Sequence, residues 1–135
     1  MNTVEFGYYG NIWIRQNTLK EIGDQNEGHY HKYDHVTLVT SGAISVEVDG
    51  YNPTEHTAPT FVIIRKDYMH KVTALEQDTV YYCLYALRDL DGQVLPDMHG
   101  GEHDPMSAGF VLVPGKNDKE LTEKAYRDAG VKSRR

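Results

Sequence analysis

The sequence has few of the features that mark a secreted or membrane-bound protein. Cys83 is the only cysteine, so no disulfide can form within one chain. The first ten residues, MNTVEFGYYG, lack the charged and apolar regions of a signal peptide. No apolar run approaches the roughly 20 residues that a membrane-spanning helix needs. We therefore expect a cytoplasmic protein with no membrane partner.

Basic residues are also scarce. Lys and Arg number 14 against 20 Asp and Glu, which gives a formal net charge of −6. The basic end VKSRR, residues 131–135, reads as a short solvated terminus. Without a basic stripe or patch, nucleic acid is not expected as a partner. The partner expected instead is a small molecule.

The chain of 135 residues suits a single domain over 1–135, with a barrel core at about 10–90. Most of it reads as short strands between turn residues, which indicates an all-β sandwich or barrel. The apolar run PTFVIIR, residues 59–65, predicts a strand buried on both faces. The other expected strands are 11–16, two strands within 35–50 that fold back at Ser41-Gly42, 70–75 and 79–88.

The sequence changes character after these strands. Residues 91–114 are rich in Gly, Asp and Pro, and we expect a loop or arm there with one short strand at 110–114. A short C-terminal helix is predicted at about 117–129. Asn117 can cap its start and Gly130 can close its end.

Histidines are concentrated in one stretch, GHYHKYDH, residues 28–35. Side chains two residues apart on a strand point the same way, so His29 and His31 should project from one face. His35 returns on the next strand and His70 begins another. A closed barrel would then gather four imidazoles from three segments. Imidazole nitrogen suits Mn, Fe, Ni, Cu and Zn, so the pattern predicts one divalent transition metal.

A second interpretation of these histidines stays open. A lone histidine in a strand is usually a surface or core residue with a hydrogen bond. The chain would then be a structural barrel that holds no metal. His99 and His103, in HGGEHD, form a smaller cluster that reads as a lid, as an adventitious metal site or as a solvated loop.

A few other side chains are candidates for chemistry beside the metal. Tyr33 and Tyr68 can donate a proton there, although tyrosines also pack on barrel walls. Arg65 can hold a substrate carboxylate in a bidentate fork, although an arginine at a strand end is often only solvated. Cys83 lies among apolar residues and reads as core.

The spacing of these histidines resembles the first motif of the cupins. In that motif a Gly is followed after five residues by His-x-His, after three or four more by Glu, and after six more by Gly. Here Gly23 precedes His29-Tyr30-His31, and Gly42 follows His35 at the expected distance. His35 stands where the family usually has Glu. A neutral ligand thus replaces an anionic one, as in the all-histidine variants of the cupin site.

The second cupin motif contributes a single metal-binding histidine, and His70 fits that place. The rest departs from the pattern, because Arg65, Asp67 and Ala74 stand where Pro, Gly and Asn are common. The resemblance covers roughly residues 10–88. The segment TALEQDTVYYCLYALRD is also similar to small cupins of marine bacteriophages.

The resemblance implies a cupin double-stranded β-helix, a jelly-roll barrel with the metal inside one mouth. His29, His31, His35 and His70 would be the ligands. The implied activity is that of a metal-dependent oxidoreductase of the dioxygenase type, acting on a small chelating substrate, with Tyr33, Arg65 or Tyr68 orienting it. The alternative is a non-catalytic module that binds a small molecule or sugar. Small cupins commonly pair through edge strands, so a homodimer is expected, with residues 3–10 as the pairing strand.

Overall fold

The computed structural model describes residues 2–27, 34–88, 91–95 and 111–112. Regular structure within these ranges is entirely β-strand, which confirms the all-β class. No helix long and apolar enough to cross a membrane occurs among them. The predicted C-terminal helix at about 117–129 lies outside these ranges. The strands are β1 (Asn2–Tyr9), β2 (Ile12–Leu19), β3 (Gln25–Glu27), β4 (His35–Ser41), β5 (Ala43–Val48), β6 (Thr54–Thr57), β7 (Thr60–Ile64), β8 (His70–Ala74), β9 (Thr79–Ala86) and β10 (Val111–Leu112).

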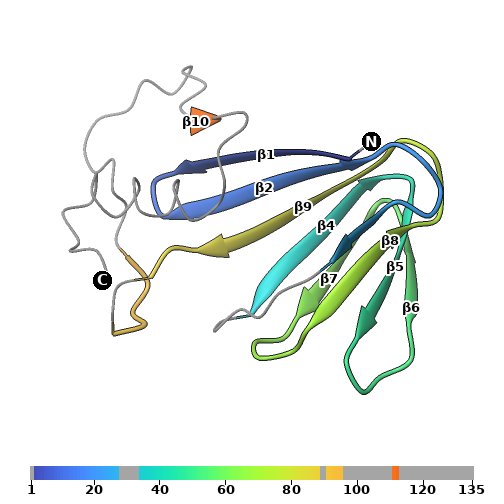
Figure 1. The fold of residues 1–135 in the computed structure, drawn as a ribbon. Coiled ribbons are helices and arrows are strands. Elements are labelled where there is room, and N and C mark those ends of the chain that lie inside the picture. Colours follow the sequence, from blue (N-terminus) through green and yellow to red (C-terminus); the bar gives the residue numbers. More distant parts are fainter. Residues whose placement is uncertain (1, 28–33, 89–90, 96–110, 113–135) are drawn as a thin grey trace. The chain divides into compact units, whose positions relative to one another are not determined.

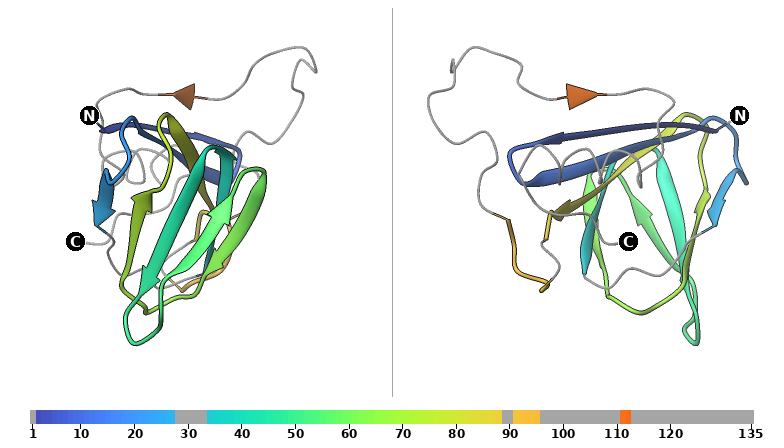
Figure 2. Two further views of the ribbon diagram at one scale, coloured as in Figure 1. Left: turned by 90° about the vertical axis from the view of Figure 1, so that its right-hand side faces the viewer. Right: turned by 60° about the vertical axis from the view of Figure 1, so that its left-hand side comes forward.

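The strands form two sheets (Figure 1). One has the order β10-β1-β2-β9-β4-β7 and the other the order β3-β8-β5-β6. The chain divides into two compact units, residues 1–4 with 16–84 and residues 5–15 with 85–135. β3 to β8 lie entirely within the first unit, and two further views show them from other sides (Figure 2).

The core of the first unit is built from apolar residues of both sheets. Alternation along β5 places Ile44 and Val46 inside, at 0% and 3% exposure, and Val48 packs partly buried against them. Because side chains alternate between the faces of a strand, these three residues form the inner face of β5. The buried members of this core are Leu19, Val39, Ile44, Val46, Ile64, Val72, Ala74 and Tyr81.

The second unit has an aromatic centre. The ring of Trp13 lies 5.9 Å from that of Phe6 and 5.8 Å from that of Tyr85. Such tilted pairs add a small attraction beyond the apolar area that they bury. Asn11 ties the neighbouring segment down, since its carbonyl accepts a bond from the Leu87 N–H at 2.8 Å.

The structure corrects the fold-back expected at Ser41-Gly42. β4 and β5 are not partners: β4 pairs with β7 and β9, while β5 pairs with β6 and β8. The chain therefore crosses between sheets at Gly42, which has φ of +74°. The buried Thr79 lies against this corner, and its hydroxyl accepts a bond from the Ala43 N–H at 3.4 Å and donates to the Glu76 carbonyl at 2.9 Å. Two strands joined by a short turn are a hairpin only when they share a sheet.

The structure also corrects the burial predicted for residues 59–65. β7 is the last strand of its sheet and covers the core with one face only. Ile64 is buried, whereas Phe61 and Ile63 on the opposite face are 67% and 43% exposed. The continuous apolar run therefore reflects an apolar outer surface and not a strand covered on both sides.

We predict that Gly42→Ala destabilises the protein more than Gly50→Ala. Both glycines have positive φ, which costs an alanine about 1–2 kcal/mol. A Cβ at Gly42 would also overlap Thr79 Oγ1 and lie 3.0 Å from the Thr79 Cα, whereas a Cβ at Gly50 meets nothing within 4 Å. Overpacking adds about 1–3 kcal/mol. Equal urea midpoints for the two variants would contradict the tight corner.

Candidate functional site

His35 and His70 come together from different sheets. His35 begins β4 in the six-stranded sheet, and His70 begins β8 in the four-stranded sheet. Their ring centroids lie 5.4 Å apart, with the ring planes inclined at 54°. His35 is 3% exposed and His70 is half-buried. Two residues far apart in the sequence thus place two imidazoles side by side.

The strand register explains why both rings point between the sheets. His35 lies directly opposite Ile64, and His70 directly opposite Val48. Residues directly opposite in an antiparallel pair share a face of the sheet. Ile64 is part of the buried core and Val48 packs against it, so both histidines lie on the inner faces.

Three of the predicted site residues, His29, His31 and Tyr33, lie outside the described residues. The structure describes the chain on either side of them, up to Glu27 and again from Asp34. β3 ends at Glu27, opposite Lys71, which is the neighbour of His70. Asp34, on the other side, is the neighbour of His35. The described residues that flank the segment with His29 and His31 therefore lie next to His70 on one side and next to His35 on the other. Within the described ranges no group of three or more His, Cys, Asp or Glu side chains could hold a metal.

β3, which leads into that segment, is fixed by the half-buried amide of Asn26. The Asn26 side chain donates to the Tyr81 hydroxyl at 2.6 Å and to Asn17 Oδ1 at 3.3 Å. Asn17 is 1% exposed and Tyr81 is 2% exposed. Polar groups that are buried and bonded in this way specify one arrangement, because any shift would leave them unsatisfied.

Asp34 fixes the other side of the segment. Its Oδ1 accepts a bond from the Lys66 N–H at 2.8 Å, and its Oδ2 accepts one from Arg65 Nη1 at 3.1 Å. These bonds lower the pKa of the Asp34 carboxyl, the Lys66 N–H most strongly and Arg65 after it, against an opposing effect of desolvation. Asp34 thus ties the start of β4 to the residues that follow β7.

A cavity of about 260 Å³ is lined by strand neighbours of the histidine pair, although neither histidine is in its lining. Two residues of its wall, Val48 and Ile64, are the cross-strand neighbours of His70 and His35. Arg65 and Tyr68, both predicted from the sequence to orient a substrate, line the same cavity. The full lining is Val46, Val48, Tyr51, Asn52, Thr54, Ile63, Ile64, Arg65 and Tyr68.

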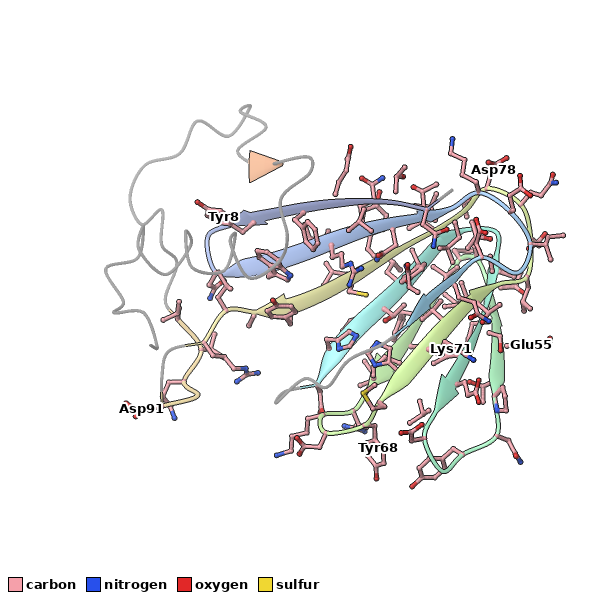
Figure 3. All side chains as sticks on the ribbon, viewed as in Figure 1. Tyr8, Glu55, Tyr68, Lys71, Asp78 and Asp91 are labelled. Carbon is pink, nitrogen blue, oxygen red and sulfur yellow. The ribbon has the colours of Figure 1, made fainter. Side chains whose placement is uncertain are left out.

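Tyr51 is a site residue that the sequence reasoning missed. Its ring meets that of Tyr68 edge-on, with centroids 5.8 Å apart. The hydrogen bond between the two hydroxyls raises the pKa of Tyr68 above its ordinary value, as does the charge interaction with Tyr51. Tyr68 lies at the opposite end of the strands from Asp78 (Figure 3). The sequence signal that could have identified Tyr51 is the Asp49-Gly50 turn, because Tyr51 follows it directly.

Cys83 and His56 are not among the residues that line this cavity. Cys83 is partly buried and packs against the core, as predicted. His56 on β6 bonds the Thr54 hydroxyl through Nε2 at 2.8 Å. His99 and His103 lie outside the described residues.

The chain was compared with known proteins. No protein-family model matches it, and no curated protein sequence matches it. Solved structures do match. An RmlC-like cupin from Methanocaldococcus jannaschii, with a double-stranded β-helix fold, has a TM-score of 0.57 at 15% identity, over 64% of this chain and 80% of that one. The chain has the cupin fold.

Two further cupin-like structures show the same fold. KdgF from Halomonas sp. has a TM-score of 0.52 at 21% identity, over 64% of this chain and 83% of that chain. An RmlC-like cupin from Shewanella frigidimarina has a TM-score of 0.52 at 17% identity, over 67% of this chain and 78% of that one. The expected double-stranded β-helix is therefore confirmed.

We predict that Asp34→Asn lowers stability at neutral pH and that the loss fades in acid. The pKa of Asp34 in the folded protein lies below its ordinary value of 3.8, so the ionised group stabilises the fold above about pH 4. That contribution disappears as the pH falls through the folded-state pKa. Urea midpoints of the two proteins between pH 7 and pH 3 measure it.

Asp49→Asn is the matched control. Asp49 is exposed in the same unit, and its side chain makes no hydrogen bond or ion pair with a described residue. The urea midpoint of Asp49→Asn should stay close to that of the wild type across the pH range. A difference in urea midpoint between Asp34→Asn and the wild type that is as large at pH 3 as at pH 7 would contradict the role of the Asp34 charge.

Proposed function

We propose that this protein is a metal-binding cupin in which His29, His31, His35 and His70 hold one divalent transition metal. The observation that carries the proposal is the pair of imidazoles from two sheets, 5.4 Å apart between ring centroids. A metal–nitrogen bond is about 2.0–2.1 Å, so two imidazoles on one ion have centroids about 4.5–5.5 Å apart. The pair fits a shared ion of the Mn, Fe, Ni, Cu or Zn series.

The ligand set has a chemical consequence. Four neutral imidazoles leave the charge of a divalent ion uncompensated, which favours an anionic, chelating ligand. The bound ion would act as a Lewis acid that lowers the pKa of such a ligand. The chain's own residues bind and orient it: Arg65 can hold a carboxylate, and Tyr68 can donate a hydrogen bond.

We further propose that the activity is that of a cytoplasmic oxidoreductase of the dioxygenase type. Its substrates would be dioxygen and a small organic molecule that chelates metal, such as an enol, a catechol or a 2-oxo acid. The supporting feature is the cavity lined by the strand neighbours of the histidine pair, since it has an apolar side and one cationic side chain. The single cysteine suits a reducing compartment.

A non-catalytic binding module is the second candidate. Among the described residues that line the cavity there is no carboxylate or histidine to act as a general base. Tyr68 cannot fill that role at neutral pH, because its pKa is raised. In this alternative the metal and the cavity hold a small molecule or sugar without converting it.

Metal content tests the proposal. We expect close to one equivalent of a transition metal per chain in tag-free wild-type protein, measured by elemental mass spectrometry. His35→Ala, His70→Ala and His31→Ala should each lose most of it, because removing even an outer-shell partner of a metal ligand weakens binding by about 10–100-fold and loss of a ligand itself should cost more. His56→Ala is the matched control and should keep its metal.

Two outcomes decide between the candidates. No metal in the wild type, even after reloading with each ion in turn, would refute the metal site. If metal is present, dioxygen uptake with a panel of enols, catechols and 2-oxo acids separates enzyme from binding module. Uptake that His70→Ala abolishes and His56→Ala retains supports the enzyme. Ligand binding without uptake supports the module.

A further inference from the structure

The chemistry of the cavity wall narrows the class of ligand. Four side chains, Val46, Val48, Ile63 and Ile64, give it an apolar side. The polar side of the wall is formed by Tyr51, Tyr68, Asn52, Thr54 and Arg65. Of these residues, only Arg65 is charged. A wall with an apolar side and one cation fits a molecule with an apolar body and one anionic group.

The size of the cavity is sufficient for a molecule with one ring. An engineered apolar cavity of about 150 Å³ is known to hold benzene. The volume here is about 260 Å³, which leaves room for a ring with a carboxylate and one further small group. The edge-on tyrosine pair adds aromatic surface against which a flat ring can pack.

Arg65 can serve such a ligand while it keeps its bond to Asp34. A guanidinium has five N–H donors, and the bond to Asp34 is made through Nη1. Its side chain is 71% exposed, so the remaining donors can turn to a ligand. Asp34 holds the head of Arg65 at the cavity and reduces the conformational freedom lost when a carboxylate binds.

We propose that the cavity binds a single-ring organic acid, with its ring between the tyrosine pair and the apolar wall and its carboxylate on Arg65. The inference rests on the proposed function, since it names the ligand class of the same site. Its own contacts are made by the cavity wall, so binding of the ring and carboxylate does not require the metal.

Benzoate is the probe. We expect calorimetric titration to show binding to wild-type protein both as purified and after removal of metal with a chelator. Benzamide, which has the same shape without the charge, and acetate, which has the charge without the ring, should each bind at least 10-fold more weakly. Equal affinity for benzoate and benzamide would overturn the role of charge.

Substitutions at Arg65 and Lys66 test where the carboxylate of benzoate binds. Arg65→Gln should weaken benzoate at least 10-fold, whereas Lys66→Gln, the same charge change one residue away, should stay within 2-fold. Lys66 does not line the cavity, and its bond to Asp34 is made by the backbone. Equal affinity in Arg65→Gln and the wild type would overturn the proposal. Benzoate binding by a wild-type protein that takes up no metal, even on reloading, would leave this inference standing and refute the metal site. A protein that takes up metal but does not bind benzoate would keep the metal site and refute this inference.

Discussion

The passage of the chain between its two sheets at Gly42 governs the geometry of the site. A positive φ and close contact with Thr79 leave room there for glycine alone. Because β4 and β5 then belong to opposite sheets, residues at their far ends face each other across the core. His35, at the start of β4, and His70, opposite the end of β5, meet for this reason. A hairpin at the same place would have left both strands in one sheet.

Much of the fold could be predicted from local sequence patterns. The predictions that failed concerned which strands pair and what covers each strand. Alternation along Ile44 and Val46 identifies the inner face of β5, because burial on one face leaves a period of two. The same reasoning misjudged β7, since Phe61 and Ile63 are apolar but exposed. The sequence of a strand shows which residues are apolar and not what covers them. Likewise, a turn at Gly42 does not reveal whether the strands around it are partners.

The candidate site, like the fold, could be predicted only in part. The spacing of the histidines predicted that His35 and His70 would converge, and the structure brings them together. His29 and His31 stay predictions. Arg65 and Tyr68 were selected by residue type and line one cavity. Tyr51 was not selected, because its approach to Tyr68 depends on how two loops from different strand pairs meet. Nothing in the local sequence of either loop encodes that distance.

The histidine pair also bears on how the protein would acquire the proposed metal. His35 and His70 are neighbours only when the two sheets that carry them pack together, and these sheets contain pairings of distant parts of the chain, such as β3 with β8 and β4 with β9. Such non-local pairing forms slowly, commonly in milliseconds to seconds. In small zinc-binding modules, by contrast, the metal drives folding itself. The strand pairings of this barrel are made by the backbone and need no metal ligand, so the barrel can fold before the proposed metal binds. In a cell short of that metal, folded apo-protein would accumulate, and metal supply would limit the occupancy of the proposed site without limiting the abundance of the protein.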